Sequence, residues 1–251
     1  MPPNADSQGN EFEQARNDYR ENILNEIKSR SDDIGYAVAI GSPSWEEFDR
    51  VGRLEAALLA QYGLAHCQML VDVGCGSGRL ARALPNVFIG EYIGTDISSE
   101  LLEHARRSCG GPGRRFVLVD GVTIPLADEA VDMVAMFSLL THLRHEESFL
   151  YLREAVRVLR SGGVAVFSFL DFSQESHWAI FHETVTAVAA NVLHHVNQFM
   201  SRDLVVAWAK MLEMEMVDIH DGQGQYIVCS EPDGTTRLDS IGQSVAIWRK
   251  P

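Results

Sequence analysis

Five short apolar runs in the middle of the chain set its predicted architecture. Each run is about five residues long and is apolar without alternation, which is typical of strands buried on both faces of a parallel sheet. Helical segments separate them, at Leu80–Leu84, Ser99–Ser108 and Glu146–Leu159. This alternation predicts an α/β, doubly wound fold with helices on both faces. The predicted strands are Met69–Val73, Tyr92–Asp96, Phe116–Asp120, Val131–Met136 and Val164–Ser168, with Gly162-Gly163 as the helix stop before the fifth.

The pattern changes after the fifth run. Apolar residues recur at spacings of three and four from Trp178 to Phe199, which predicts one long helix with an apolar stripe. A second helix is expected over Arg202–Leu212, with Ser201 as its N-cap. Two late apolar runs, Met214–Ile219 and Ser244–Trp248, are expected to pair and to complete a mostly parallel, seven-stranded sheet. The helical stripe consists of Trp178, Phe181, Val185, Val188, Val192, Val196 and Phe199.

The N-terminal region has a polar, helical pattern. Tyr19, Ile23 and Ile27 form one stripe at a spacing of four. Further on, Ser44 and Glu47 have the spacing of a helix-capping pair, and the helix that they begin should reach Gln61 and end near Gly63. The expected segments are a disordered N-terminus over 1–11, a helical cap over 12–66, the core over 67–172, a helical segment over 173–213, and C-terminal strands over 214–251.

Charge and composition exclude several classes of protein. The 251 residues carry a formal net charge of −14, and proteins that bind nucleic acid or anionic membranes need surplus Lys and Arg instead. The sequence has no apolar run of membrane-spanning length and no signal-peptide pattern near its start. Its 4 cysteines are scattered and form no CxxC pair, which favours a reduced, cytoplasmic protein without a disulfide framework or a zinc site.

The candidate chemistry begins with the glycine-rich segment that follows the first strand. Gly74, Gly76 and Gly78 alternate between this strand and the next helix, so the backbone can approach a ligand closely. A simple tight turn would not need three glycines. The spacing also fails the GxGxxG dinucleotide pattern, because Arg79 stands at the third glycine position. Asp72 would repel a pyrophosphate and attract an ammonium group, so the loop favours a ligand that combines an amino acid with a nucleoside.

With these motifs, the chain resembles the class I S-adenosylmethionine-dependent methyltransferases over about residues 45–172. The segment from Asp72 to Gly78, which includes Cys75, is similar to the family motif that holds the methionine part. The segment from Tyr92 to Ser98 is similar to the second motif, which implies that Asp96 accepts hydrogen bonds from both ribose hydroxyls and that Ile97 lies beside the cofactor.

Two further stretches extend the resemblance. Val119-Asp120-Gly121 is similar to the third motif, which implies that Asp120 accepts from the adenine amino group and that Gly121 lies beside the ring. The segment from Phe137 to Leu143 is similar to the loop after the fourth strand, with Phe137 near the cofactor. The chain has Arg-Ser-Gly-Gly at 160–163 where the family commonly has Lys-Pro-Gly-Gly. An arginine upstream of the core, with Arg53 as the candidate, is expected to pair with the methionine carboxylate.

Methyl transfer from a sulfonium needs alignment of the reactants and exclusion of water, with a base only where the acceptor must lose a proton. His142 is the candidate base, with His177, His182 and Tyr19 as alternatives. In similar enzymes an insertion after the fifth strand covers the acceptor, which implies that residues 173–213 form a lid and acceptor-pocket segment. Trp178, Phe181 and the methionine-rich Met200–Met216 region would then line an apolar acceptor pocket. Cys75 has no basic neighbour that would make it a nucleophile. No metal is expected.

The sequence therefore predicts an enzyme that transfers a methyl group from S-adenosylmethionine, by in-line displacement, to an oxygen or nitrogen of a small, partly apolar metabolite. The product cofactor would be S-adenosylhomocysteine. We expect a monomer or homodimer without nucleic-acid or membrane partners. The alternatives are a methyltransferase of tRNA or protein, a non-catalytic cofactor-binding protein and a nicotinamide oxidoreductase. The third of these is disfavoured by the missing third glycine of the dinucleotide pattern.

Overall fold

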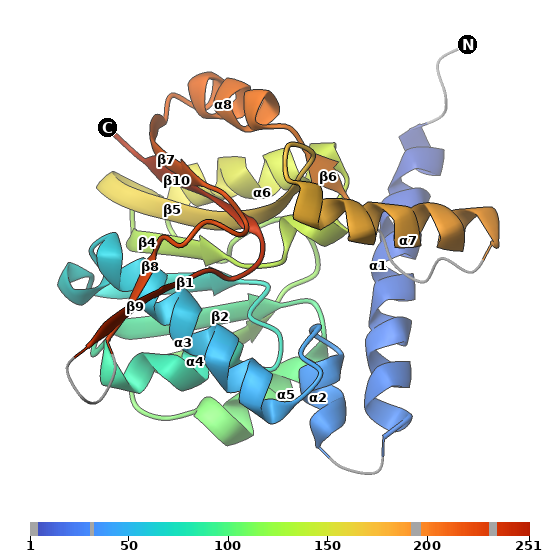
Figure 1. Cartoon of the computed structure of the whole chain (residues 1–251), viewed down its shortest axis with the longest axis horizontal. Helices are drawn as coiled ribbons and strands as arrows, with labels where there is room; N and C mark the ends of the chain where they lie inside the picture. The colour runs from blue at the N-terminus through green and yellow to red at the C-terminus, as the bar shows by residue number, and fades with distance from the viewer. Residues whose placement is uncertain (1–4, 31–32, 192–196, 231–234) are drawn as a thin grey trace.

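The apolar runs form the centre of one eight-stranded sheet in the computed structural model, which describes residues 5–30, 33–191, 197–230 and 235–251 (Figure 1). The strand order is β3-β2-β1-β4-β5-β10-β7, and β6 pairs with β5 outside this path. β1 to β5 run parallel, whereas β10 is antiparallel to both of its neighbours. The doubly wound, mostly parallel fold is therefore confirmed, and β6 is an addition to the seven expected strands. The strands are β1 (Met69–Val73), β2 (Glu91–Asp96), β3 (Arg114–Leu118), β4 (Val131–Met136), β5 (Leu159–Asp171), β6 (Phe199–Met200), β7 (Glu215–His220) and β10 (Ser244–Arg249), and a separate hairpin consists of β8 (Ile227–Ser230) and β9 (Thr236–Asp239).

Both faces of the sheet are covered, which explains why the strands are apolar without alternation. Leu70 of β1 packs into a cluster with residues of α3 and α4, and its neighbour Val71 packs into a second cluster with residues of α6 and α8. Both side chains are fully buried. The helices are α1 (Ala5–Lys28), α2 (Ile34–Val38), α3 (Trp45–Gln61), α4 (Arg79–Ala83), α5 (Ser99–Cys109), α6 (His145–Val158), α7 (Trp178–Ala189) and α8 (Arg202–Met211), with short 3-10 helices at Leu64–His66, Leu84–Asn86, Leu140–His142 and Glu175–His177.

The predicted helix ends are confirmed where a cap defines them. The Ser44 hydroxyl accepts the N–H of Glu47 at 3.1 Å at the start of α3, and Gly63 follows that helix at φ 100°. The Ser201 hydroxyl likewise accepts the N–H of Leu204 at the start of α8. Local side-chain chemistry therefore fixes both helix starts.

The expected glycine stop fails because strand pairing overrides the local pattern. Gly162 and Gly163 lie inside β5, where they exchange backbone hydrogen bonds with Lys250, so the chain enters the strand earlier than a glycine stop implies. In the N-terminal segment over 1–11, α1 begins at Ala5, and residues 1–4 lie outside the described part.

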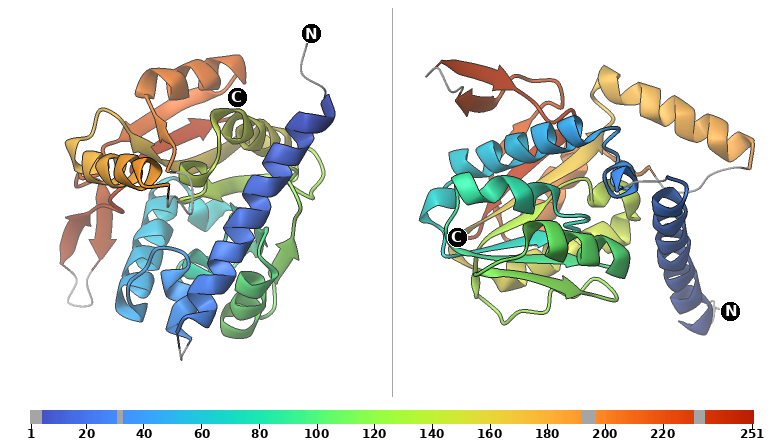
Figure 2. Two further views of the ribbon diagram at one scale, coloured as in Figure 1. Left: turned by 90° about the vertical axis from the view of Figure 1, so that its right-hand side faces the viewer. Right: turned by 90° about the horizontal axis from the view of Figure 1, so that it is seen from below.

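The predicted helix over Trp178–Phe199 is wrong in its second half. α7 ends at Ala189, Asn191 has a φ of 55°, and Phe199 belongs to β6, where it pairs with Leu170 of β5. Val192 and Val196 of the expected stripe lie outside the described residues. α7 stands out from the body of the molecule (Figures 1 and 2), and none of its residues is buried. Its apolar side chains are therefore at least partly exposed.

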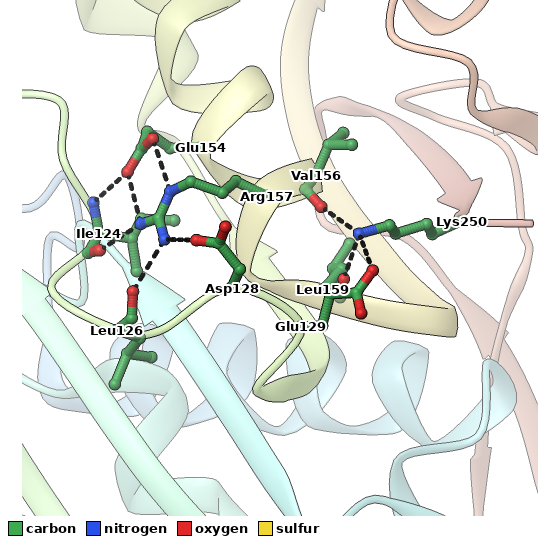
Figure 3. Close-up of polar contacts among 9 residues, drawn as sticks. All are labelled: Ile124, Leu126, Asp128, Glu129, Glu154, Val156, Arg157, Leu159 and Lys250. Carbon is green, nitrogen blue, oxygen red and sulfur yellow. Dashed lines mark hydrogen bonds and ion pairs between the residues drawn. The ribbon is translucent and has the colours of Figure 1, made fainter.

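Polar contacts fix the loop after β3 and the end of the last strand (Figure 3). The Arg157 guanidinium on α6 donates to the carbonyl oxygens of Ile124 and Leu126 and pairs with Asp128. The Lys250 ammonium donates to the carbonyl oxygens of Val156 and Leu159 at the junction of α6 and β5. The Arg157 contacts hold the loop that continues from the carboxyl end of β3, and the Lys250 contacts hold the end of the last strand against α6 and β5. Among the described residues, no helix combines the length and the apolar composition that crossing a bilayer requires.

Candidate active site

A cavity of about 1130 Å³ lies at the carboxyl ends of the parallel strands. Its floor comes from the ends of β1, β2 and β4 and from the loop after β3, and its roof comes from α1 and residues 38–44. Figure 2 shows α1 lying across this end of the molecule. The order of the strands reverses between β1 and β4, and ligands of open α/β sheets bind at such a reversal.

The glycine loop forms one wall of the cavity. Gly74 has a φ of 75°, and its N–H and that of Cys75 both donate to the carbonyl oxygen of Thr95 on β2. Gly76 has a φ of 54°, and a Cβ there would lie 2.9 Å from Ile40. Both positions favour glycine because residues that carry a side chain rarely adopt a positive φ. The loop is thereby held against β2, with its backbone facing the cavity.

Asp96 joins this loop to the end of β2. One carboxylate oxygen accepts the N–H of Gly76 at 2.9 Å, and the other accepts the N–H of Ser98 at 2.8 Å. Burial raises the pKa of Asp96, and these backbone donors oppose that rise. Because a carboxylate offers about four lone-pair positions, each oxygen retains capacity for a further donor such as a ribose hydroxyl.

The cavity floor has an excess of buried acids. Asp72 accepts a hydrogen bond from the Tyr92 hydroxyl at 2.8 Å, and burial raises its pKa to about 7. Glu55 pairs with Arg79 at 2.6 Å, but burial still raises the pKa of Glu55. Carboxylates that are costly to ionise when alone are stabilised by a cationic ligand. The floor therefore suits a ligand that carries positive charge.

The roof helix α1 contacts the sheet side of the cavity near Arg20 and contacts α2 near Ile27. The Arg20 guanidinium donates to the carbonyl oxygen of Ile97 at 3.0 Å and pairs with Asp120 at 2.9 Å. Ile23 is buried, and Gly35 of α2 permits close approach because a Cβ there would lie 2.9 Å from the backbone of Ile27. Sequence reasoning found the stripe of α1 but not its position over the cavity.

Most of the predicted cofactor residues line the cavity. They are Asp72, Gly74, Cys75, Gly76, Asp96, Ile97, Gly121 and Phe137. Gly78, Asp120 and Arg53 do not. Gly78 caps α4, and Arg50, one helical turn before Arg53, lines the cavity instead. The side chain of Asp120 is 81% exposed, and its pairing with Arg20 holds the pKa of Asp120 below its usual range. It therefore anchors the roof helix rather than facing the cavity.

Of the candidate bases, His142 and Tyr19 line the cavity, and their rings lie 5.9 Å apart. Burial raises the pKa of Tyr19, which disfavours the phenolate that a base would need. His177 is buried outside the cavity, where its Nδ1 accepts the N–H of Asp171, so its Nε2 donates to the Gly242 carbonyl oxygen. His177 therefore has a structural role. His182 lies on α7, away from the cavity lining.

The acceptor-pocket expectation is wrong for Trp178 and Phe181. Neither side chain lines the cavity, and Phe181 instead packs against Phe172 and Phe199 at ring distances of 5.8 and 5.5 Å. The methionine-rich region over 200–216 also contributes nothing to the lining. From this part of the chain, Ile180 and Asn197 line the cavity. The other side chains of α7 do not, because the helix points away from the sheet.

Buried polar atoms in the lining test whether S-adenosylmethionine fits this cavity. Among the described residues, Arg16 Nε, Arg79 Nε and Thr95 Oγ1 are buried without a hydrogen-bond partner, and all three residues line the cavity. Unpaired buried polar groups are rare and point to a polar ligand. The acidic floor also suits the ammonium and sulfonium groups of this cofactor. In the described residues, no cluster of His, Cys, Asp or Glu is placed to hold a metal ion.

Comparison with known families agrees with this geometry. The methyltransferase-domain family model matches residues 71–167, which hold the glycine loop, Asp96 and the strands β2 to β4. Residues 71–167 therefore form a methyltransferase domain. An S-adenosylmethionine-dependent methyltransferase from Mesorhizobium loti superposes with a TM-score of 0.58 at 14% identity, over 81% of this chain and 100% of that chain. At that identity, the superposition shows a shared fold.

Curated relatives align with this chain over part of their length. An uncharacterized methyltransferase of Mycobacterium ulcerans is 36% identical over 40% of this chain and 38% of its own length. The tRNA (carboxymethyluridine(34)-5-O)-methyltransferase of Saccharomyces cerevisiae is 30% identical over 45% and 39%, respectively. The trans-aconitate 2-methyltransferase of Variovorax paradoxus is 31% identical over 53% and 49%. The chain thus spans less than half the length of these three relatives.

The pKa of Asp72 predicts that cofactor binding depends on pH. Near pH 7 this carboxyl is half protonated in the free protein, and a bound ammonium group would favour the carboxylate. Affinity for S-adenosylhomocysteine should therefore rise about tenfold from pH 6 to pH 8, with proton release. Calorimetry in buffers of different ionisation enthalpy measures both quantities. Asp72→Asn should lose this part of the pH dependence, and an identical pH profile in the two proteins would contradict the assignment.

Proposed function

We propose that this chain transfers a methyl group from S-adenosylmethionine to an oxygen or nitrogen of a small, partly apolar molecule. The size of the cavity is the observation that carries the proposal. At about 1130 Å³ it exceeds the size of ordinary single-ligand pockets, so it has room for a nucleoside-amino acid and a second small molecule. Leu139, Val122 and Ile180 supply apolar surface to its lining.

When bound, S-adenosylmethionine supplies a methyl group on a sulfonium that is already activated for displacement. Asp96 would hold the ribose, and Asp72 and the glycine loop would hold the amino-acid part. α1 would exclude water by covering the cavity, held there by Arg20. Fixed, mutually oriented reactants remove much of the entropic barrier, by about 7–11 kcal/mol in favourable cases. Where the acceptor loses a proton, His142 would take it from the acceptor O–H or N–H.

His142→Gln tests the assignment of the base. Turnover should fall by about 100-fold or more, because general base catalysis contributes roughly 10²–10⁴ in rate. Affinity for S-adenosylhomocysteine should stay within about twofold, since His142 lies in the loop after β4 and not in the glycine loop. Steady-state rates and calorimetry give the two values. Unchanged turnover would leave His142 with a structural role only.

A tRNA acceptor is the second candidate, because one relative's name states that substrate. The net charge of −14 opposes it, since a tRNA-binding surface needs surplus basic residues. A non-catalytic cofactor-binding protein is the third. We also propose that the protein is cytoplasmic and a monomer or homodimer.

Calorimetry with S-adenosylhomocysteine, followed by transfer of radiolabelled methyl groups to panels of small molecules, tRNA and proteins, tests these readings. Binding and labelling of a small molecule is the expected result. Binding without labelling of any acceptor would support the non-catalytic reading, and the absence of binding would overturn the proposal.

A further inference from the structure

A closed ring of hydrogen bonds stands at the wall of the cavity opposite the cofactor residues. Asp72 and Asp96 belong to β1 and β2, whereas Ser138 follows β4 and Gln243 precedes β10. The sheet order places these two pairs on opposite sides of the β1–β4 reversal. Ser138 and Gln243 both line the cavity. This half of the cavity is therefore the part left for a second molecule.

The third member of the ring lies beneath the other two. Ser168 of β5 is fully buried, and its hydroxyl accepts the N–H of Ser138 at 2.7 Å. The same hydroxyl donates to the side-chain oxygen of Gln243 at 2.6 Å. The Gln243 amide nitrogen then donates to the Ser138 hydroxyl oxygen at 3.2 Å, which closes the ring.

The backbone N–H of Ser138 can only donate a hydrogen bond, and this fixes the direction of the other bonds in the ring. A backbone N–H only donates, so Ser168 must accept from Ser138 and use its own proton on Gln243. The Gln243 oxygen is thereby fixed as the acceptor, and its amide nitrogen must face Ser138. Two donors remain, the Ser138 O–H and the second N–H of Gln243. Within the described part of the chain, no hydrogen bond from either proton to the protein is seen.

The backbone at Ser138 is held in an uncommon conformation. Its φ is 57°, a region that residues other than glycine rarely adopt and that costs about 1–3 kcal/mol. The Ser168 hydroxyl holds the N–H of Ser138, and the Thr141 hydroxyl donates to its carbonyl oxygen at 2.8 Å. Strain of this kind, fixed by neighbours on both sides of the peptide, is typical of a position at a binding site.

We propose that Ser138 and Gln243 bind a neutral carbonyl or hydroxyl oxygen of the methyl acceptor, with Ser168 as the positioning residue. The inference rests on the proposed function and names the class of its acceptor. Two converging donors match the lone pairs of one oxygen atom. A primary ammonium group would meet the same two donors, and within the ring it would find only the second lone pairs of the Ser138 hydroxyl and of the Gln243 side-chain oxygen as acceptors.

The charges of the cavity disfavour a carboxylate as the bound group. Its lining includes three arginines, and two of them are already paired, Arg50 with Glu47 at 2.8 Å and Arg79 with Glu55 at 2.6 Å. An anion would therefore find Arg16 of α1 as the remaining arginine of the lining, among seven acidic residues. The acidic residues of the lining are Glu26, Glu46, Glu47, Glu55, Asp72, Asp96 and Glu147.

Four probes with one apolar body test the inference. Benzamide and benzyl alcohol carry a neutral oxygen, benzylamine is a cation and benzoate is an anion. Their dissociation constants are measured by NMR titration of the protein, with and without saturating S-adenosylhomocysteine. The neutral pair should bind at least tenfold more tightly than the charged pair. Equal or tighter binding of benzylamine or benzoate, or no binding of benzamide, would overturn the inference.

Variants show whether the ring makes this contact. Gln243→Glu replaces a donor by acceptors, so benzamide should bind at least tenfold more weakly and benzylamine more tightly. Ser138→Ala should weaken benzamide severalfold. Gln225→Glu makes the same chemical change at an exposed position and should alter neither. Thermal unfolding confirms that each variant is folded. Probe affinities that no ring variant changes would give the ring a structural role alone.

The proposed function and this inference fail separately. Loss of the proposed function appears as a lack of affinity for S-adenosylhomocysteine. The probe series on the free protein still measures whether neutral oxygens are selected at Ser138 and Gln243. Probe selectivity without cofactor binding would retain the ring as a binding site and remove the methyl transfer.

Discussion

Asp96→Ala is expected to weaken S-adenosylhomocysteine binding by about 10²–10⁴-fold. The variant would lose two charge-assisted hydrogen bonds to the ribose, each worth about 1.5–3 kcal/mol. It would also release the N–H groups of Gly76 and Ser98, which the carboxylate holds in place. The glycine loop and the ribose site would therefore be affected together. Calorimetric titration measures the change.

Asp203→Ala is the matched control, because Asp203 is an exposed acid on α8, outside the cavity. It should bind S-adenosylhomocysteine like the natural protein. Circular dichroism and thermal unfolding separate loss of the site from loss of the fold. If folded Asp96→Ala bound with natural affinity, Asp96 would have no part in holding the cofactor.

Gly52→Ala is expected to lower the free energy of unfolding by about 2–3 kcal/mol. A Cβ at this position of α3 would lie 2.5 Å from the carbonyl oxygen of Arg79, which is backbone and cannot turn aside. Alanine favours a helix over glycine by about 1 kcal/mol, but separating α3 from α4 costs more than this gain. For a chain of this size the loss corresponds to roughly 4–12 °C in Tm.

Gly111→Ala provides the comparison, since a Cβ there would meet nothing within 4 Å. Its Tm should stay within about a degree or rise slightly, because alanine reduces the entropy of the unfolded chain. Differential scanning calorimetry of both variants is the measurement. A Tm for Gly52→Ala equal to that of the natural protein would contradict the close contact between α3 and α4.

The central strands were predictable because burial on both faces leaves a continuous apolar signature. The bounds of β1 and β4 agree with the prediction, and both strands lie inside the sheet. β3 is the edge strand and ends at Leu118, two residues before the predicted end at Asp120. The apolar run continues past the last pairing there, so pattern alone places the strand too late.

The site was predictable on the side of the glycine loop and less so elsewhere. Asp72 and Asp96 follow from strand ends and glycine spacing, which are local signals. Asp120 lies beyond the edge strand and faces solvent, where Arg20, 100 residues earlier in the sequence, neutralises it. Such a contact between distant segments leaves no periodic trace. The ring of Ser138, Ser168 and Gln243 has the same character, because three separate strands bring it together.

The division of the cavity between two halves of the sheet has an evolutionary consequence. Residues 71–167, shared with the family model, include the glycine loop and Asp96, whereas α1, Ser168 and Gln243 lie outside this stretch. Under the proposed function, substitutions in those outer segments would change which compound is methylated while the donor is held as before. Kinship through the shared stretch is thus compatible with divergent chemistry, and exchanging the outer segments between relatives is a direct route to new acceptor preferences.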